Sequence, residues 1–259
     1  MGILLAMATI DEHLRLVLAR HRIDTSALSP VRGVQSIVEP TIRQWGGPYI
    51  VDIGPSGSFA KGTAVGGGTD IDIFVSLSSS VPDPLKTIYE TLFTAFSNLG
   101  FQPRRQNVSI GLSVGGWKVD VTPGRRQDQY GNYHSLWRNK TGSWLQTNIR
   151  EHCRVVSGSS RLDEIRLIKI WRNRYGLSWP SFYLEMFVID ALRGARIGNL
   201  QANIITVLRA IADTLATRRL IDPANTNNIL SDTLDANEKF HVSQTARAGL
   251  NSAWNVVFQ

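Results

Sequence analysis

The chain has 259 residues, of which 42% are apolar and 19% are charged, as in ordinary soluble globular proteins. No run of eighteen apolar residues occurs, which argues against a membrane-spanning helix, and the single cysteine, Cys153, excludes an internal disulfide. We therefore expect a cytoplasmic protein without a membrane partner. The net charge of +7, from 28 Lys and Arg against 21 Asp and Glu, favours polyanionic partners such as nucleotides, RNA or DNA.

The first half of the chain mixes helical and strand patterns. Hydrophobic periodicity predicts helices over residues 9–22, 31–45 and 84–99. Period-two patterns predict strands over residues 49–53, 69–75, 106–112 and 117–121. A Gly-Ser turn at Gly57 and Ser58 follows the first of these strands.

The second half reads as almost wholly helical. The periodicity predicts helices over residues 143–156, 161–175, 181–192, 199–218 and 236–257, and the turn-forming residues 222–228 predict a loop between helices. The change of pattern near residue 140 predicts two lobes. Residues 1–140 would form an α+β lobe with a small mixed sheet, and residues 141–259 a helical lobe. A cleft between lobes is the expected place for a ligand.

Two aspartates one residue apart form the most informative feature. Asp70 and Asp72 alternate with Ile71, Ile73 and Val75, so both carboxylates project from one face of a strand, about 6 to 7 Å apart. Unpaired, they would repel each other. A bound Mg²⁺, which takes hard oxygen ligands, would remove that penalty.

A third carboxylate, Asp120, lies in another alternating run between Val119 and Val121. If this strand lies beside that of Asp70 and Asp72, the three carboxylates converge. Such a set suits two-metal phosphoryl transfer, with two Mg²⁺ ions that Mn²⁺ can replace. Gly57 and Ser58 would bind phosphate through exposed amides and a hydroxyl, because glycine lets the backbone approach closely.

This combination of residues resembles the signature of the polymerase-β-like nucleotidyltransferase superfamily. Residues 57–63 are similar to the opening motif of 2′-5′-oligoadenylate synthetases, bacterial cyclic-oligonucleotide synthases and archaeal-type CCA-adding enzymes. Residues 167–171 and 180–185 resemble the helical region of these families. Residues 144–152 look like the Trp…Asn-Pro…His segment before it, with Ile149 in place of the proline. The resemblance spans roughly residues 49–192.

The resemblance implies an α+β catalytic lobe, a helical lobe and an active site between them. Asp70, Asp72 and Asp120 would be both catalytic residues and metal ligands. Lys61 and Lys169 would bind the triphosphate of the substrate. The hydroxyl of Ser181, at a helix start, would bind phosphate or cap the helix. His152 would face the nucleotide or have a structural role, and Tyr183 would stack on a base or pack in the core.

We expect a template-independent nucleotidyltransferase that attaches the nucleotidyl group of an NTP to a nucleotide or oligonucleotide hydroxyl and releases pyrophosphate. By resemblance, its product would be a cyclic or short linear oligonucleotide signal, as in antiphage defence. Terminal addition to an RNA end (the tRNA CCA type) or a DNA end is the alternative, with nucleic acid as acceptor or activator. Adenylyl transfer to a small molecule is a second alternative. A catalytically silent nucleotide-binding module is a further one from another class.

Overall fold

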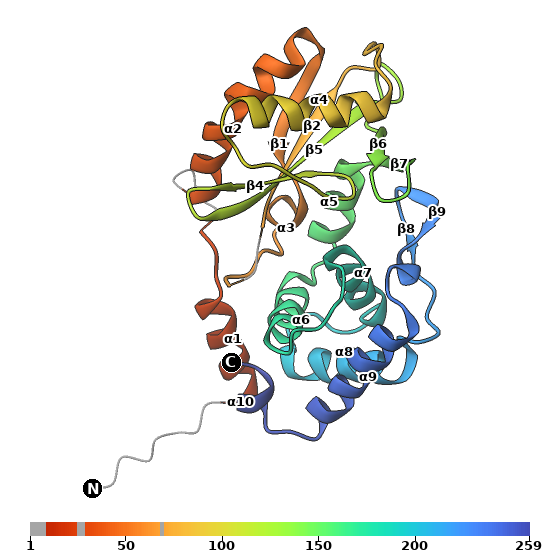
Figure 1. The fold of residues 1–259 in the computed structure, drawn as a ribbon. Helices are drawn as coiled ribbons and strands as arrows, with labels where there is room; N and C mark the ends of the chain where they lie inside the picture. Colours follow the sequence, from red (N-terminus) through yellow and green to blue (C-terminus); the bar gives the residue numbers. More distant parts are fainter. Residues whose placement is uncertain (1–8, 25–28, 68–69) are drawn as a thin grey trace, which may run out of the picture.

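The computed structural model describes residues 9–24, 29–67 and 70–259 of the chain. Figure 1 shows a sheet with two covering helices above and a group of helices below. The first half contains α1 (Ile10–Arg20), α2 (Pro30–Gly46), the 3₁₀ helix η1 (Gly47–Tyr49), β1 (Ile50–Pro55), α3 (Gly57–Lys61), β2 (Ile71–Leu77), α4 (Leu85–Asn98), β3 (Arg104–Arg105), β4 (Ile110–Val114), β5 (Trp117–Arg126) and β6 (His134–Arg138). The second half contains β7 (Ser143–Thr147), α5 (Ile149–Ser157), α6 (Leu162–Arg174), α7 (Ser181–Ala191), α8 (Leu200–Thr214), β8 (Ile221–Asp222), β9 (Asn225–Ile229), the 3₁₀ helix η2 (Leu230–Thr233), α9 (Ala236–Leu250) and α10 (Trp254–Val257).

The main sheet is mixed. Its strands run in the order β1-β2-β5-β4-β3, and β6 extends it by pairing with β5 and with β7. β2 and β5 are parallel, whereas the other pairs are antiparallel. A parallel pair needs a crossover connection, and here α4 lies in the connection between β2 and β5.

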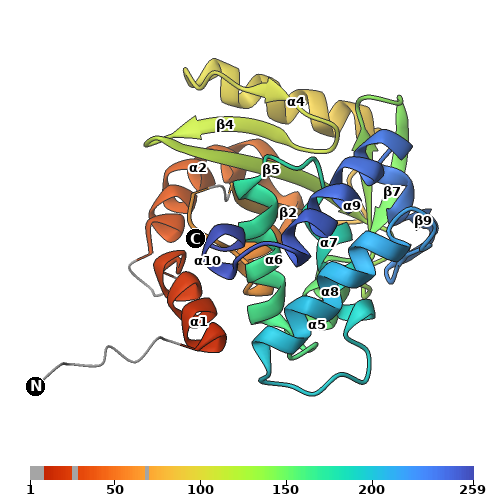
Figure 2. The ribbon, with the colours of Figure 1, turned by 90° about the horizontal axis from the view of Figure 1, so that it is seen from below.

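One face of this sheet is covered by α2 and α4, whose apolar sides complete a buried core. Side chains alternate between the two faces of β2, so Ile71, Ile73 and Val75 point into that core, where each is at most 1% exposed. Each such side chain stabilises the fold by about 1.5–3 kcal/mol when it leaves water. Figure 2 shows α4 on the far side of β4 and β5 from the helices of the second half. The opposite sheet face therefore carries the polar residues of β2 and β5.

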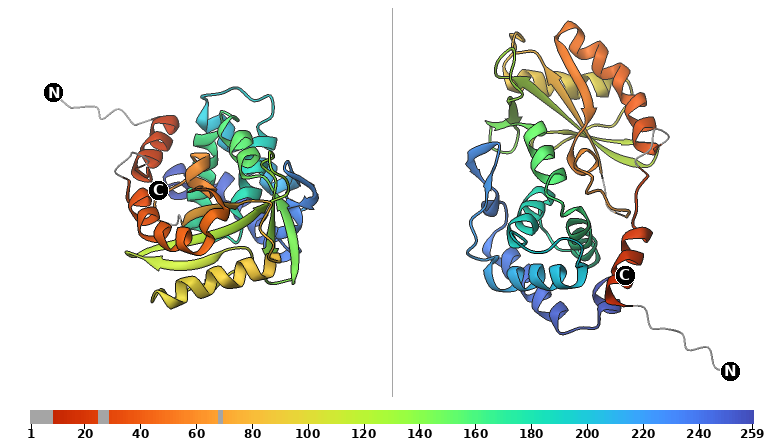
Figure 3. Two further views of the ribbon diagram at one scale, coloured as in Figure 1. Left: turned by 90° about the horizontal axis from the view of Figure 1, so that it is seen from above. Right: turned by 180° about the vertical axis from the view of Figure 1, so that it is seen from behind.

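A second core joins the helices of the second half. It is built on α6, α7 and α8, and α9 packs along α8. α1 belongs to this core as well, because its buried residues Leu14 and Val17 pack there rather than against the sheet. Figure 3 shows α5 running between the sheet and these helices.

The predicted elements of the sheet half are largely present, but three predictions in the second half are wrong. Residues 236–257, predicted as one helix, form α9 and α10 with residues 251–253 between them. Residues 143–147, predicted as the start of a helix, form β7, and α5 begins only at Ile149 after an Asn148 cap. Residues 222–228, predicted as a loop, contain most of the β8–β9 hairpin. Helices α5 to α8 follow Asn148, and α1 packs in the same core as these helices although it precedes the sheet in sequence. The division into two lobes near residue 140 stays a prediction. Thr69, the predicted start of the second strand, is outside the described residues.

Among the helices that the structure describes, none combines the length and the apolar character that crossing a bilayer requires.

Candidate active site

The strand pair β2–β5 brings two of the predicted carboxylates together. The strands are hydrogen-bonded neighbours, and Asp72 is directly opposite Asp120 in their register. Because side chains alternate along a strand, both project from the sheet face that α2 and α4 leave open. The condition set by the sequence, that these two strands lie side by side, is met.

The third carboxylate stands one step before β2. Asp70 is exposed, and its charge acts on both Asp72 and Asp120. Burial raises the pKa of Asp72 to about 6, and the charges of Asp120 and Asp70 add to that effect. Burial and the charge of Asp70 likewise raise the pKa of Asp120 to about 6. The three carboxylates are thus electrostatically coupled, as groups that share a cation would be.

Gly57 lies directly against the Asp72 carboxylate. Its backbone has φ +56°, which favours glycine, and a Cβ there would lie 1.8 Å from Asp72 Oδ2. The Ser56 N–H donates to the Asp72 carbonyl at 2.8 Å, which ties the loop to the strand. The short helix α3 then begins at Gly57 and carries Ser58 in its first turn. The predicted phosphate turn and the carboxylates therefore form one site.

Gln106 supports Asp120, although the sequence did not single it out. Its Nε2 donates to Asp120 Oδ1 at 2.6 Å, and its Oε1 accepts from Ser109 Oγ at 3.1 Å. Gly111, opposite Asp120 in the β4–β5 register, leaves room for this amide, since a Cβ there would meet Gln106 Nε2 at 2.6 Å. One oxygen of Asp120 is thereby fixed, and Oδ2 is left for a ligand.

The donor set fits a divalent cation. Among the described residues, no group of three or more His, Cys, Asp or Glu side chains is placed so that it could hold a metal ion. Asp72 and Asp120 are nevertheless neighbouring hard oxygen donors whose raised pKa values reflect burial and repulsion, and a cation would relieve both. Mg²⁺ suits such an open site because it keeps waters and substrate oxygens in its shell.

The two predicted triphosphate lysines meet at a buried glutamate. Lys61 Nζ and Lys169 Nζ each lie 2.6 Å from a different oxygen of Glu185, which is fully buried. Thr63 Oγ1 donates to the same carboxylate at 2.6 Å. Two ammonium groups against one carboxylate leave one net positive charge, and both lysines act electrostatically on Asp72. The cluster therefore adds positive potential beside the carboxylates.

Ser181 and His152 lie on the helices that face this cluster. Ser181 begins α7, and its Oγ accepts from Arg172 Nη1 at 3.0 Å. His152 Nε2 donates to Asp222 Oδ1 at 2.8 Å, so this histidine is already paired. Asp222 lies in the segment expected to be a loop, and nothing in the linear pattern indicates that it pairs with His152.

Tyr183 packs in the core, which is one of the two roles expected for it, and the other role, stacking on a base, is corrected. Its side chain is fully buried, packed edge-on against Trp179 and Phe187. Phe182, one residue earlier, is only partly buried and lies on a different side of α7. Its ring is 4.1 Å from the His152 ring and 5.0 Å from Lys61 Nζ. Phe182 is therefore the aromatic residue of α7 that lies beside the candidate site.

Comparison with known proteins finds no matching family model. A curated relative, the cyclic AMP-AMP-AMP synthase of Escherichia coli (strain MS 115-1), is 28% identical in a match over 159 residues, and the match covers 56% of this chain and 50% of the relative. The chain thus spans about half the length of the curated relative that it matches.

Solved structures resemble the chain over nearly its whole length. CdnG of Bradyrhizobium diazoefficiens, a CD-NTase solved with GTP, gives a TM-score of 0.76 at 15% identity and covers 94% of this chain and 91% of its own. CdnC of E. coli MS115-1, solved with ATP, gives a TM-score of 0.73 at 19% identity and covers 93% of this chain and 90% of its own. The Cid1 poly(U) polymerase, solved with MgATP, gives 0.69 at 14% identity, covering 96% and 98%. These likenesses confirm the fold class expected from the sequence.

Proposed function

We propose that this chain is a nucleotidyltransferase of the polymerase-β-like superfamily, which transfers the nucleotidyl group of an NTP to a nucleotide hydroxyl and releases pyrophosphate. The observation that carries the proposal is the register of β2 and β5, which places Asp72 beside Asp120. Gly57 lies against the Asp72 carboxylate. The names of the relatives, synthases of cyclic nucleotides and a poly(U) polymerase, support the same reaction class.

In the proposed reaction each group has a part in an in-line displacement. Asp70, Asp72 and Asp120 would hold two divalent cations, which supply charge stabilisation on the attacking and leaving oxygens. Gln106 donates to the Asp120 carboxylate and so holds it in one orientation. Gly57 and Ser58 offer backbone amides and a hydroxyl to the phosphates, and the cluster of Lys61 and Lys169 adds positive potential. Positioning and electrostatics account for most of the catalysis in such reactions.

We further propose that the product is a cyclic or short linear oligonucleotide that acts as a signal, as in defence against phage. The similarity to a cyclic AMP-AMP-AMP synthase supports this reading over terminal addition to a nucleic acid. A neighbouring structure is a complex of CdnC with HORMA-deltaN, and we propose by analogy that a protein partner acts on this chain.

Pyrophosphate release tests the proposal. Purified protein with each NTP and Mg²⁺ or Mn²⁺ should release pyrophosphate, and Asp72→Asn and Asp120→Asn should abolish release without loss of the fold. Asp213→Asn, at an exposed position on α8, is the matched control and should keep full activity. Equal activity of both site variants and the control would refute the site. Turnover only with a polynucleotide acceptor, falling steeply with salt, would favour terminal addition.

A further inference from the structure

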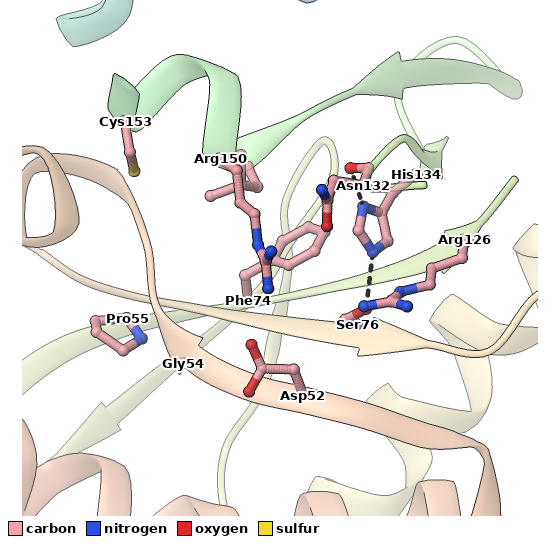
Figure 4. A pocket seen from close by; sticks show the side chains of 11 residues that line it. Asp52, Gly54, Pro55, Phe74, Ser76, Arg126, Asn132, His134, Arg150 and Cys153 are labelled. Atoms are coloured by element: carbon pink, nitrogen blue, oxygen red, sulfur yellow. Dashed lines mark hydrogen bonds between the residues drawn. The ribbon is translucent and has the colours of Figure 1, made fainter. Parts of the chain in front are cut away.

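A pocket of roughly 180 Å³ opens on the same sheet face as the carboxylates Asp72 and Asp120. Its walls come from β1, β2, β5, β6 and the first turns of α5 (Figure 4). Phe74 and Ser76 follow Asp72 at two-residue intervals on β2, so all three project from one face. Ser76 is four residues beyond Asp72, about 13 Å along the strand. A nucleotide bound at the carboxylates could therefore extend its base toward this pocket.

A row of polar side chains crosses four strands at the far wall. Asp52 on β1 is the register partner of Ser76 on β2, and Arg126 on β5 is the partner of His134 on β6. Arg126 Nε donates to Ser76 Oγ at 3.2 Å and so connects the two pairs. Figure 4 shows these side chains around Phe74, with Arg150 approaching from α5.

The hydrogen bonds in this row can run in only one direction. His134 Nδ1 lies 2.9 Å from the Asn132 carbonyl, which can only accept, so Nδ1 carries the proton. His134 Nε2 must then accept from the Ser76 hydroxyl at 2.8 Å. Burial lowers the pKa of His134 to about 4, which keeps the ring neutral. Arg126 donates from Nε to Ser76 and lines the pocket. Within the described residues its two terminal nitrogens make no hydrogen bond, so they can donate to a ligand.

Two charged side chains stand at the rim of the pocket. Within the described part of the chain, neither Asp52 nor Arg150 makes a side-chain hydrogen bond or an ion pair, and both are exposed at the pocket rim. Phe74 is held edge-on by the His134 ring at 4.9 Å, which fixes the orientation of its aromatic face. The pocket therefore combines an aromatic surface with a guanidinium donor on one side and a carboxylate acceptor on the other.

We propose that this pocket binds the guanine base of the acceptor nucleotide, an inference that rests on the proposed function. A guanidinium donates in parallel to guanine O6 and N7, which is the commonest specific arginine–base contact. The adjacent edge of guanine, N1–H and the N2 amine, presents two donors that suit one carboxylate. Arg126 would bind O6 and N7, Asp52 would accept from N1–H and N2, and Phe74 would contact the ring. Adenine offers no acceptor at position 6 and no donor at N1.

Equilibrium binding of nucleoside monophosphates tests this without requiring turnover. Calorimetry with the full chain should give the tightest binding for GMP, weaker binding for IMP, which lacks the N2 amine, and about tenfold weaker binding for AMP and UMP. AMP binding as tight as GMP, or inorganic phosphate competing equally well, would overturn the inference.

Asp52→Asn isolates the pocket from any other nucleotide site. GMP affinity should fall about tenfold while AMP affinity stays unchanged, and Asp213→Asn, on a distant helix, should change neither. An equal fall for both nucleotides, or none for GMP, would contradict the assignment. If no NTP gives pyrophosphate but GMP selectivity and its loss in Asp52→Asn persist, the proposed function fails while the base pocket stands.

Discussion

Gly57 has a left-handed backbone conformation and lies against the Asp72 carboxylate. Gly57→Ala would place a Cβ 1.8 Å from Asp72 Oδ2, so the carboxylate or the loop must move. We expect kcat about a hundredfold lower, the loss typical of a displacement near 1 Å in such sites. The cost in the free energy of unfolding should be only about 1–2 kcal/mol, from the left-handed backbone. Steady-state pyrophosphate release and urea unfolding measure the two effects.

Gly176→Ala is the matched control for this substitution. Gly176 has φ +59°, nearly that of Gly57, but a Cβ there would meet nothing within 4 Å. It should show the same loss of stability with full activity. If both variants lose activity equally, the contact between Gly57 and Asp72 has no special role.

The raised pKa values of Asp72 and Asp120 lead to a prediction about metal affinity. Both carboxylates titrate near pH 6, from burial first and repulsion second. Because a cation must displace any bound proton, Mn²⁺ affinity should be constant well above pH 6. Below it, the affinity should fall about tenfold per pH unit for each proton displaced. Electron paramagnetic resonance of free Mn²⁺ measures this. An affinity that does not change between about pH 7.5 and pH 5 would contradict the assignment of these ligands.

The position of a site residue was predictable from the sequence where the residue belongs to a short alternating pattern. The alternation around Asp72 and Asp120 placed both carboxylates on one strand face each, and the structure pairs them. Helical periodicity does not show whether Phe182 or Tyr183 faces the site. α7 is apolar over most of its length, so its sequence does not indicate which side packs in the core. Asp222 and Gln106 were missed because their partners, His152 and Asp120, are brought to them only by the tertiary fold.

At the scale of elements, Glu185 joins three helices beside the site. Lys61 comes from α3, Lys169 from α6 and Glu185 from α7. Removing one member of a buried ion pair leaves an uncompensated charge, so Glu185→Gln should lower the free energy of unfolding by about 3–5 kcal/mol at neutral pH. Glu151→Gln removes a solvent-facing pair with Arg154 and should change stability little.

The pH dependence separates this ion pair from simple packing. Burial alone would raise the pKa of Glu185, but Lys169 and Lys61 outweigh it and hold the pKa below its ordinary value of 4.5. The stabilisation is therefore fully present above that value and is lost as pH falls through the lowered folded-state pKa. Urea unfolding from neutral to acid pH should show wild type and Glu185→Gln converging. A difference that is constant with pH would indicate a packing defect instead.

The elements of the sheet half were largely predictable, because alternation in β2 and β5 and amphipathicity in α2 and α4 each follow from one buried face. Residues 143–147 were not. Trp144 and Leu145 fit a helical period as well as a strand, and pairing with β6 decides the outcome. The β8–β9 hairpin has polar residues typical of a loop, and hydrogen bonds between Gln146, Ala224 and Asn225 connect it to β7.

Across the whole molecule, the last described residues complete the core to which α1 belongs. Phe258 is fully buried, stacks on Trp254 at 5.6 Å, and its carbonyl lies 3.0 Å from His13 Nε2 on α1. Phe258→Ala should lower the free energy of unfolding by about 3–5 kcal/mol. Val256→Ala, at a position that is 50% exposed, should have little effect. Equal effects in urea unfolding would show that this segment is not part of the core.

The change of pattern along the chain predicts that strands and helices separate, and the two buried cores agree with this, but the pattern does not predict the core in which α1 packs. α1 precedes the sheet in sequence, so linear order placed it in the first lobe, whereas Leu14 and Val17 are buried with the helices of the second. Amphipathicity shows that a helix has a face to bury, and says nothing of which core receives it.

Product analysis with α-phosphorus-labelled NTPs tests most directly the claim that these carboxylates catalyse nucleotidyl transfer. Wild-type protein with divalent metal should join labelled nucleotides through new phosphodiester bonds, identifiable by mass spectrometry, and Asp120→Asn should yield none while retaining its fold. Unjoined nucleotides from the wild type under every pairing of NTPs and with added RNA or DNA ends, or equal product from Asp120→Asn, would contradict the account.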